Sequence, residues 1–76
     1  MNRTEALAAL KTINTARTTV NAEFTGTGFF FADAVAALGD FERASRHLAA
    51  LIKVGAVRCT TVRLGFSTHD FYSVAA

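Results

Sequence analysis

The sequence predicts an α+β fold in which three helices are followed by a β-hairpin. Three observations support this prediction. An apolar pattern with helical spacing starts near Thr4. Two further helical segments meet at Gly39, and the second of them stops at Gly55. Beyond Gly55 the apolar residues alternate along the chain, as they do in strands.

The length and composition favour one small domain, residues 1–76, that associates with a second copy. The chain has 76 residues, of which 51% are hydrophobic, and its mean hydropathy is +0.30. A domain of this size cannot hide so much apolar surface, so we expect a homodimer. The chain has a single cysteine, Cys59, which excludes an internal disulfide and favours a reducing, cytoplasmic compartment.

The first helix is expected over residues 4–18. Thr4 is a suitable N-cap, and Glu5 places a negative charge in the first turn, where the helix dipole favours it. Glu5 and Lys11 interrupt the apolar pattern, so we expect a helix of the mature fold rather than a signal peptide or a membrane span. The β-branched residues near its end are expected to fray. Residues 21–28 alternate glycine with threonine, which predicts a loop or a very short strand.

The second and third helices are expected over residues 31–38 and from Asp40 or Phe41 to Gly55, with Asp40 as the N-cap of the third. The apolar face of the third helix, expected to be buried, consists of Phe41, Ala44, Leu48, Leu51 and Ile52. The opposite face, expected to be exposed, consists of Glu42, Arg43, Arg46, His47, Ala50 and Lys53.

The hairpin is expected to pair residues 56–64 with residues 70–74 across a turn at 65–68. Cys59 is expected to be a small buried residue of the first strand. No further ligands at metal spacing accompany the two histidines, so no metal or other cofactor is expected. A Cys59–His69 nucleophile pair lacks a third group, and the chain is therefore not expected to be an enzyme.

The net charge of +2 lies entirely in the second half of the chain. Residues 1–38 carry three basic and three acidic side chains, whereas residues 39–76 carry five basic and three acidic ones. The excess falls on the third helix and the hairpin, which is the sign and place that contact with phosphates requires.

Two stretches, ASRHLAAL from Ala44 and KVGAVR from Lys53, resemble bacterial winged helix-turn-helix regulators, most closely those of the arsenic-repressor type. The resemblance covers residues 31–74 and implies a fold of three helices followed by a β-hairpin wing. Two departures are clear: the metal-binding cysteines and the additional dimerising helices of that family are absent. In both respects the chain is similar to the small winged-helix proteins of phages and mobile elements.

The resemblance implies that the third helix enters the major groove of double-stranded DNA and that the protein regulates transcription from a palindromic site. Arg43 and Arg46 would contact guanines or phosphates. Ser45 would bind a base or a phosphate, and His47 would donate a hydrogen bond to the DNA backbone. Arg63 of the hairpin would contact the minor groove or a phosphate. An acidic residue of the third helix would accept a hydrogen bond from the amino group of a cytosine. The predicted DNA-binding residues are Glu42, Arg43, Ser45, Arg46, His47, Lys53 and Arg63.

Three consecutive phenylalanines, residues 29–31, cannot all face one core. Either two are buried and one covers a loop, or one ring reaches a second subunit. The residues expected at an interface are Leu7, Phe29, Phe30 and Tyr72. The alternative function is a winged-helix protein-interaction module, a phage or mobile-element inhibitor or adaptor for a host or phage protein, that does not use DNA. The low net charge and the abundance of apolar residues favour that alternative.

Overall fold

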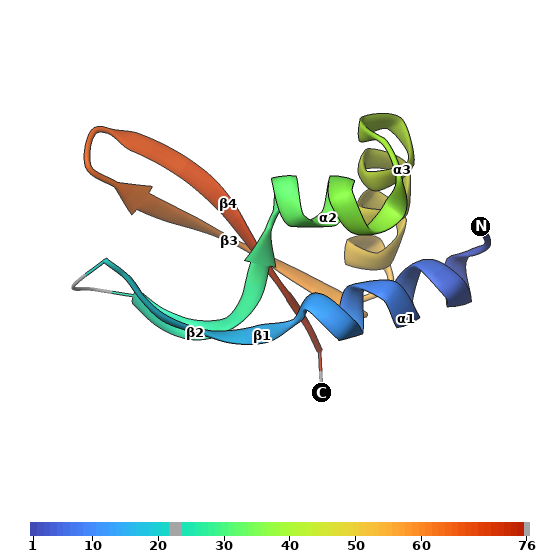
Figure 1. Ribbon diagram of the computed structural model, residues 1–76, viewed down its shortest axis with the longest axis horizontal. Coiled ribbons are helices and arrows are strands. Elements are labelled where there is room, and N and C mark those ends of the chain that lie inside the picture. The colour runs from blue at the N-terminus through green and yellow to red at the C-terminus, as the bar shows by residue number, and fades with distance from the viewer. Residues whose placement is uncertain (22–23, 76) are drawn as a thin grey trace.

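The computed structural model describes the backbone of residues 1–21 and 24–75, and the side chains of these residues except 15–21, 24–26 and 64. The predicted α+β fold with three helices is confirmed (Figure 1). The elements in chain order are α1 (Arg3–Ile13), β1 (Thr15–Asn21), β2 (Phe24–Phe30), α2 (Phe31–Leu38), α3 (Phe41–Lys53), β3 (Val57–Leu64) and β4 (Ser67–Val74). Within the described part of the chain, no helix has the length and apolar character to span a bilayer.

Helix α1 begins and ends earlier than its sequence predicts. Its N-cap is Asn2 and not Thr4, because the Asn2 side chain accepts from the backbone N–H of Glu5 at 2.8 Å while the Glu5 carboxylate accepts from the Asn2 N–H at 2.9 Å. This capping box satisfies two of the free donors of the first turn. The prediction that the helix runs to residue 18 is wrong, since α1 ends at Ile13 and a strand follows.

Strands β1 and β2 form a β-hairpin in the segment for which the sequence predicted a frayed helix end followed by a loop or a very short strand. Strands β1 and β2 are antiparallel, and their register pairs Thr15 with Gly28 and Arg17 with Gly26. β-Branched residues lose side-chain freedom in a helix and suit an extended chain, so threonines 15, 18 and 19 favour a strand once a partner strand is present.

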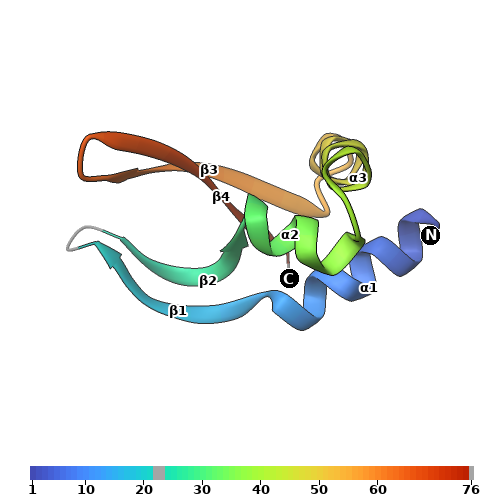
Figure 2. The same cartoon turned by 45° about the horizontal axis from the view of Figure 1, so that its top comes forward.

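The four strands form an antiparallel sheet in the order β1-β2-β4-β3. β3 and β4 pair along their full length, from Val57 opposite Val74 to Leu64 opposite Ser67, which confirms the predicted hairpin. β2 joins β4 only at its end, through Phe29 opposite Tyr72 and Phe30 opposite Phe71. Both hairpins extend away from the three helices (Figures 1 and 2).

Helices α2 and α3 follow the prediction closely. α2 spans residues 31–38, and the backbone N–H of Phe30 donates to the Asp33 carboxylate at 2.9 Å at its start. The chain turns at Gly39, whose φ of 108° is a conformation that residues with a Cβ rarely adopt. The Asp40 carboxylate then accepts from the backbone N–H of Arg43 at 2.7 Å, which confirms Asp40 as the N-cap of α3.

The core lies where the helices meet the base of the sheet. Its buried members are Ala6, Leu10, Phe29, Ala34, Leu38, Ala44, Leu48, Leu51, Val57 and Tyr72. Phe29 is fully buried and stacks on Tyr72 with ring centroids 5.7 Å apart. The expectation that these two rings form an intermolecular interface is therefore wrong, because the chain's own core covers both. Leu7 is half-buried and packs against this core.

Candidate nucleic-acid interface and the adjacent groove

The outer face of α3 carries an exposed pair of cations, as predicted. Arg46 and Lys53 are seven residues apart, two helical turns, and both are exposed. Glu42, one turn before Arg46, is exposed on the same side. This face lies opposite the buried one, so its side chains are accessible to a binding partner that approaches α3 from solvent.

Arg43 lies at the edge of this face and is paired within the chain. Its Nε is 3.8 Å from a carboxylate oxygen of Asp40, and both side chains are about half exposed, at 51% and 57%. An exposed pair of this kind adds at most about 1 kcal/mol to stability, so a phosphate can replace the carboxylate at small cost.

The structure overturns the prediction that His47 contacts DNA. Its side chain is only 3% exposed and lies on the buried face of α3. Its Nδ1 accepts a hydrogen bond from Nε of Arg3 in α1 at 3.3 Å, which links the two helices. On the helix, His47 lies beside the buried residues Ala44, Leu48 and Leu51. The prediction placed it on the exposed face because histidine is polar.

The environment of His47 disfavours its protonated form. Burial lowers its pKa below 6.5, and the positive charges of Arg3, Arg46, the N-terminus and Arg43 lower it further, in that order. Since Nδ1 accepts from Arg3, the neutral ring carries its proton on Nε2. That buried atom has no hydrogen-bond partner among the residues that the structure describes.

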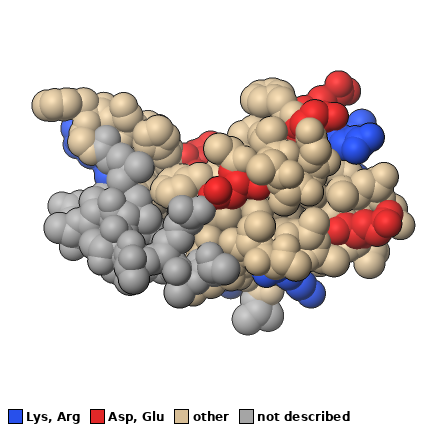
Figure 3. Space-filling model, in the orientation of Figure 1, with Lys and Arg blue, Asp and Glu red and all other residues tan. Residues whose placement is uncertain are grey.

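Arg63 lies far from the cations of α3. It is exposed in β3, opposite Thr68, next to the turn of the β3–β4 hairpin. In Figures 1 and 2 this turn lies at the end of the molecule remote from α3. The Lys and Arg side chains do not gather into one patch on the face shown in Figure 3. The predicted DNA contacts therefore fall into two separate places, α3 and the hairpin tip.

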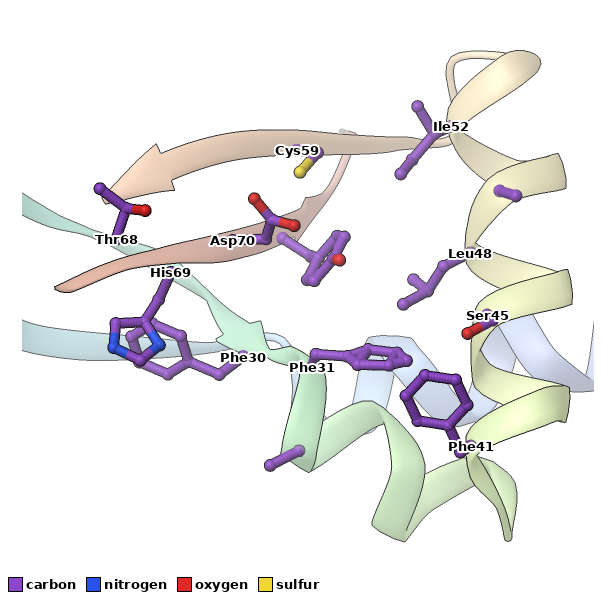
Figure 4. Close-up of a pocket in the computed structure, with 13 residues that line it drawn as sticks. Phe30, Phe31, Phe41, Ser45, Leu48, Ile52, Cys59, Thr68, His69 and Asp70 are labelled. Carbon is purple, nitrogen blue, oxygen red and sulfur yellow. The ribbon is translucent and has the colours of Figure 1, made fainter. Parts of the chain in front are cut away.

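A groove of about 850 Å³ separates α3 from the β3–β4 hairpin. Figure 3 shows the hollow on the surface, and Figure 4 shows the side chains that enclose it. It is lined by Phe30, Phe31, Ala32, Phe41, Ser45, Leu48, Ala49, Ile52, Cys59, Thr68, His69, Asp70 and Tyr72. The rings of Phe31 and Phe41, which both line the groove, meet edge to face with centroids 5.2 Å apart.

The α3 wall of the groove contains side chains that the sequence assigned to the core. Phe41 is 69% exposed and Ile52 is 37% exposed. The buried stripe of α3 is displaced around the helix toward His47, which leaves these two at its opposite edge, facing the groove. Ser45, predicted to contact DNA, is also exposed and lines this wall. No charged residue of α3 lines the groove.

The hairpin wall is more polar. Asp70 is the single charged residue among those that line the groove, and it has no hydrogen bond or ion pair with any described residue. Cys59 is exposed on this wall, so the expectation that it is buried is wrong. Partial desolvation and then the Asp70 charge raise the pKa of the Cys59 thiol. A raised pKa keeps the thiol protonated and makes it a poor nucleophile.

Cys59 and His69 do not form a reactive pair. Across the strands Cys59 lies opposite Tyr72, and His69 lies opposite Val62. The His69 ring packs against Phe30 at a centroid distance of 6.4 Å, away from the thiol (Figure 4). Among the described residues no three His, Cys, Asp or Glu side chains come together as metal ligands.

No family model, no curated protein and no solved structure matches this chain.

Proposed function

We propose that this protein is a winged helix-turn-helix protein that binds double-stranded DNA and regulates transcription. The observation that carries the proposal is the placement of α3. The helix follows α2 after a tight turn at Gly39, buries one face in the core, and is followed directly by the β3–β4 hairpin. A second helix with one face fixed in the core and the other exposed is the geometry that presents side chains to a major groove.

Arg46 is the central contact of the proposed interface. It is exposed midway along α3, and its guanidinium suits either the O6 and N7 atoms of a guanine or a phosphate. Lys53 lies about 10 Å farther along the helix axis, a distance that suits a phosphate at the edge of the groove. Ser45 adds a hydroxyl on the side nearer to the hairpin.

Arg63 would act as a separate phosphate contact of the wing. The hairpin tip lies far from α3 in Figure 1, so this arginine would reach the flanking DNA rather than the same base pairs. Its loss should weaken binding to all sequences alike, whereas loss of a base contact on α3 should change the preferred sequence.

The experiment is selection of binding sites from random duplex DNA at two salt concentrations, followed by affinity measurements on the selected site. We expect Arg46→Ala to weaken binding by about 1–3 kcal/mol and to relax the sequence preference. The matched control is Lys11→Ala, which removes one exposed positive charge from α1. Equal losses in the two variants would indicate net charge alone, and no loss in Arg46→Ala would exclude α3 as the reading helix.

The second candidate is a winged-helix protein-interaction module, and the groove beside α3 favours it. An uncharged helix wall with two partly exposed apolar side chains suits a protein surface better than a phosphate backbone. The same selection decides between the candidates, since a module of this kind should show no enriched site and no salt-sensitive affinity.

A further inference from the structure

Within the described part of the chain, one hydrogen bond joins α1 to α3. Nε of Arg3, in the first turn of α1, donates to Nδ1 of His47, in the middle of α3, at 3.3 Å. The N-terminal end of α1 lies beside α3 in both ribbon views (Figures 1 and 2). His47 is 3% exposed, whereas residues 1–5 are all exposed. A buried ring of α3 is therefore bonded to an arginine in an exposed turn of α1.

This hydrogen bond requires an uncharged imidazole. A neutral ring can accept at Nδ1 when its proton is on Nε2, whereas a protonated ring has N–H groups at both positions and accepts nothing. The guanidinium of Arg3 also has donors only. Protonation of His47 would replace the bond with a contact between two donors that both carry positive charge.

The charged groups that act on His47 are all cations. Arg3 and the N-terminal amine belong to the N-terminal end of the chain, and Arg46 and Arg43 belong to α3 itself. A proton on the ring would add a fifth positive charge to this group. Because the ring is buried, water screens that charge poorly.

The acidic residues of the three helices do not offset these charges. Glu5 takes part in the capping box of α1. Asp33 and Asp40 accept from backbone N–H groups at the starts of α2 and α3. Glu42 is exposed on the outer face of α3. None of the four is among the groups that shift the pKa of His47, so a protonated ring has no anion to stabilise it.

We propose that His47 and Arg3 form a proton-sensitive latch, which holds the first turn of α1 against α3 and releases it when the ring is protonated. The inference does not depend on DNA binding. Release also gives Nε2 of His47 access to water. That atom is buried and has no hydrogen-bond partner among the described residues, so the closed latch leaves one donor unsatisfied.

The rest of α1 is held in place without the latch. Leu10 is fully buried in the core, and the Asn14 side chain accepts from the backbone N–H of Val74 at 3.0 Å. Among residues 3–6 only Ala6 is buried, and it contributes a single methyl group. Since a helix of 11 residues is marginal in water without tertiary contacts, a first turn that leaves α3 should unwind.

The test is amide hydrogen exchange, followed by NMR at about pH 7.5 and about pH 5.5 and corrected for the intrinsic exchange rate. The amides of Ala6, Leu7 and Ala8 report on the latch, because they bond to the carbonyls of residues 2–4. We expect their opening equilibrium constant to rise by up to about tenfold at the lower pH. Over this range an exposed histidine gains a proton more readily than the buried one.

A repeat in about 1 M urea separates release of the first turn from unfolding of the whole chain. A local opening exposes little new surface, so the three amides should exchange at the same rate with and without urea. Amides in the β3–β4 ladder should exchange faster in urea, because they open with the whole fold. First-turn amides that respond to urea as the ladder does would exclude a latch.

Substitutions identify the two partners. In His47→Gln the side-chain oxygen can accept from Arg3 but does not ionise, so the opening of the first turn should no longer depend on pH. Arg3→Met keeps the histidine and removes the donor, and it should raise the opening equilibrium constant by about fivefold at neutral pH, the effect of one ordinary hydrogen bond. Circular dichroism establishes that each variant is folded, and the exposed position of Arg3 makes Arg3→Met the safer of the two.

Lys11→Met is the matched control. It removes the other cation of α1, which is exposed in the last turn and does not act on His47. Exchange of the first-turn amides should be the same in this variant as in the natural sequence. Three results would overturn the proposal: first-turn exchange that does not change with pH, a pH response that persists in His47→Gln, and equal effects of Arg3→Met and Lys11→Met.

Discussion

Phe29, Phe30 and Phe31 are identical neighbours in the sequence and occupy three different environments. Phe29 points into the core and stacks on Tyr72. Phe30, the next residue of the strand, points to the other face of the sheet, where its ring meets Phe71 edge to face at 5.2 Å. Phe31 begins α2 and its ring reaches the groove. The sequence predicted that the three could not share one core, and the strand-to-helix change at this point explains how they separate.

Among the glycines whose surroundings the structure describes, Gly28 has the least room for an added carbon. A Cβ there would overlap the carbonyl oxygen of Tyr72 and lie 2.5 Å from the ring of Phe71. Both neighbours belong to the β4 strand at its junction with β2, so neither moves easily. We expect Gly28→Ala to lower the free energy of unfolding by about 1–3 kcal/mol, as overpacking does, measured by urea unfolding.

The control for Gly28→Ala is Thr27→Ala, one residue earlier and exposed. It should change the free energy of unfolding by less than about 0.5 kcal/mol. Similar effects in both variants would mean that strand propensity, and not the close approach to Tyr72, decides the stability at this point.

His47 should make the stability of the fold depend on pH. Its pKa in the folded chain lies below the 6.5 of an unperturbed histidine, chiefly because of burial and then Arg3. Between the two values the unfolded chain binds more protons than the folded one. The free energy of unfolding should therefore be fully retained above about pH 6.5 and fall as the pH drops toward the folded pKa.

The measurement is urea unfolding at several pH values from about 7.5 to 5.5, above the range in which carboxylates titrate. His47→Gln should flatten the slope of stability against pH, because glutamine does not ionise. His69→Gln is the control, because it removes the chain's other histidine and leaves His47 in place. A slope that survives in His47→Gln would contradict the assignment.

At the scale of elements, the sequence predicted what local rules determine. α2 was predicted to the residue and α3 to within two residues, because Gly39 and Gly55 mark the ends of the two helices. Alternation predicted both strands of the β3–β4 hairpin, but β4 begins at Ser67, three residues before the predicted start. The hairpin turn is the two-residue Gly65-Phe66 rather than residues 65–68.

What the sequence did not predict depends on contacts between distant segments. Strand β1 has no apolar alternation of its own, and pairing with β2 is what makes it a strand. The buried His47 accepts its hydrogen bond from Arg3, forty-four positions earlier in the chain. On α3 the helical pattern gave the correct apolar stripe but not its edges, because only the position of the hairpin decides whether Phe41 faces the core or the groove.

Asp40 offers a test of the α2–α3 turn as an element. Its side chain caps the first turn of α3, and losing such a cap costs about 0.5–2 kcal/mol. We expect Asp40→Ala to lose this amount in thermal or urea unfolding. Asp40→Asn keeps a capping oxygen but removes the charge that faces Arg43, so it should lose much less. Equal losses would assign the effect to the ion pair at 3.8 Å instead of the cap.

At the scale of the whole molecule, the two hairpins determine the shape. The principal extents are 36, 24 and 20 Å, and the hairpins account for the long one because they extend from the helices (Figure 2). An elongated small domain exposes more surface than a sphere of the same volume. That shape places Phe66 at one end and the α3 cations toward the other.

The core contact of Tyr72 also has an optical consequence. The chain has one tyrosine and no tryptophan, so in the folded protein Tyr72 is its main intrinsic chromophore near 280 nm, with phenylalanines absorbing weakly at shorter wavelengths. Its ring stacks on that of Phe29, and its centroid lies 6.3 Å from the ring centroid of Phe31. Tyr72 also lines the groove. Emission and near-ultraviolet dichroism therefore report from the junction of sheet, helix and groove without any label.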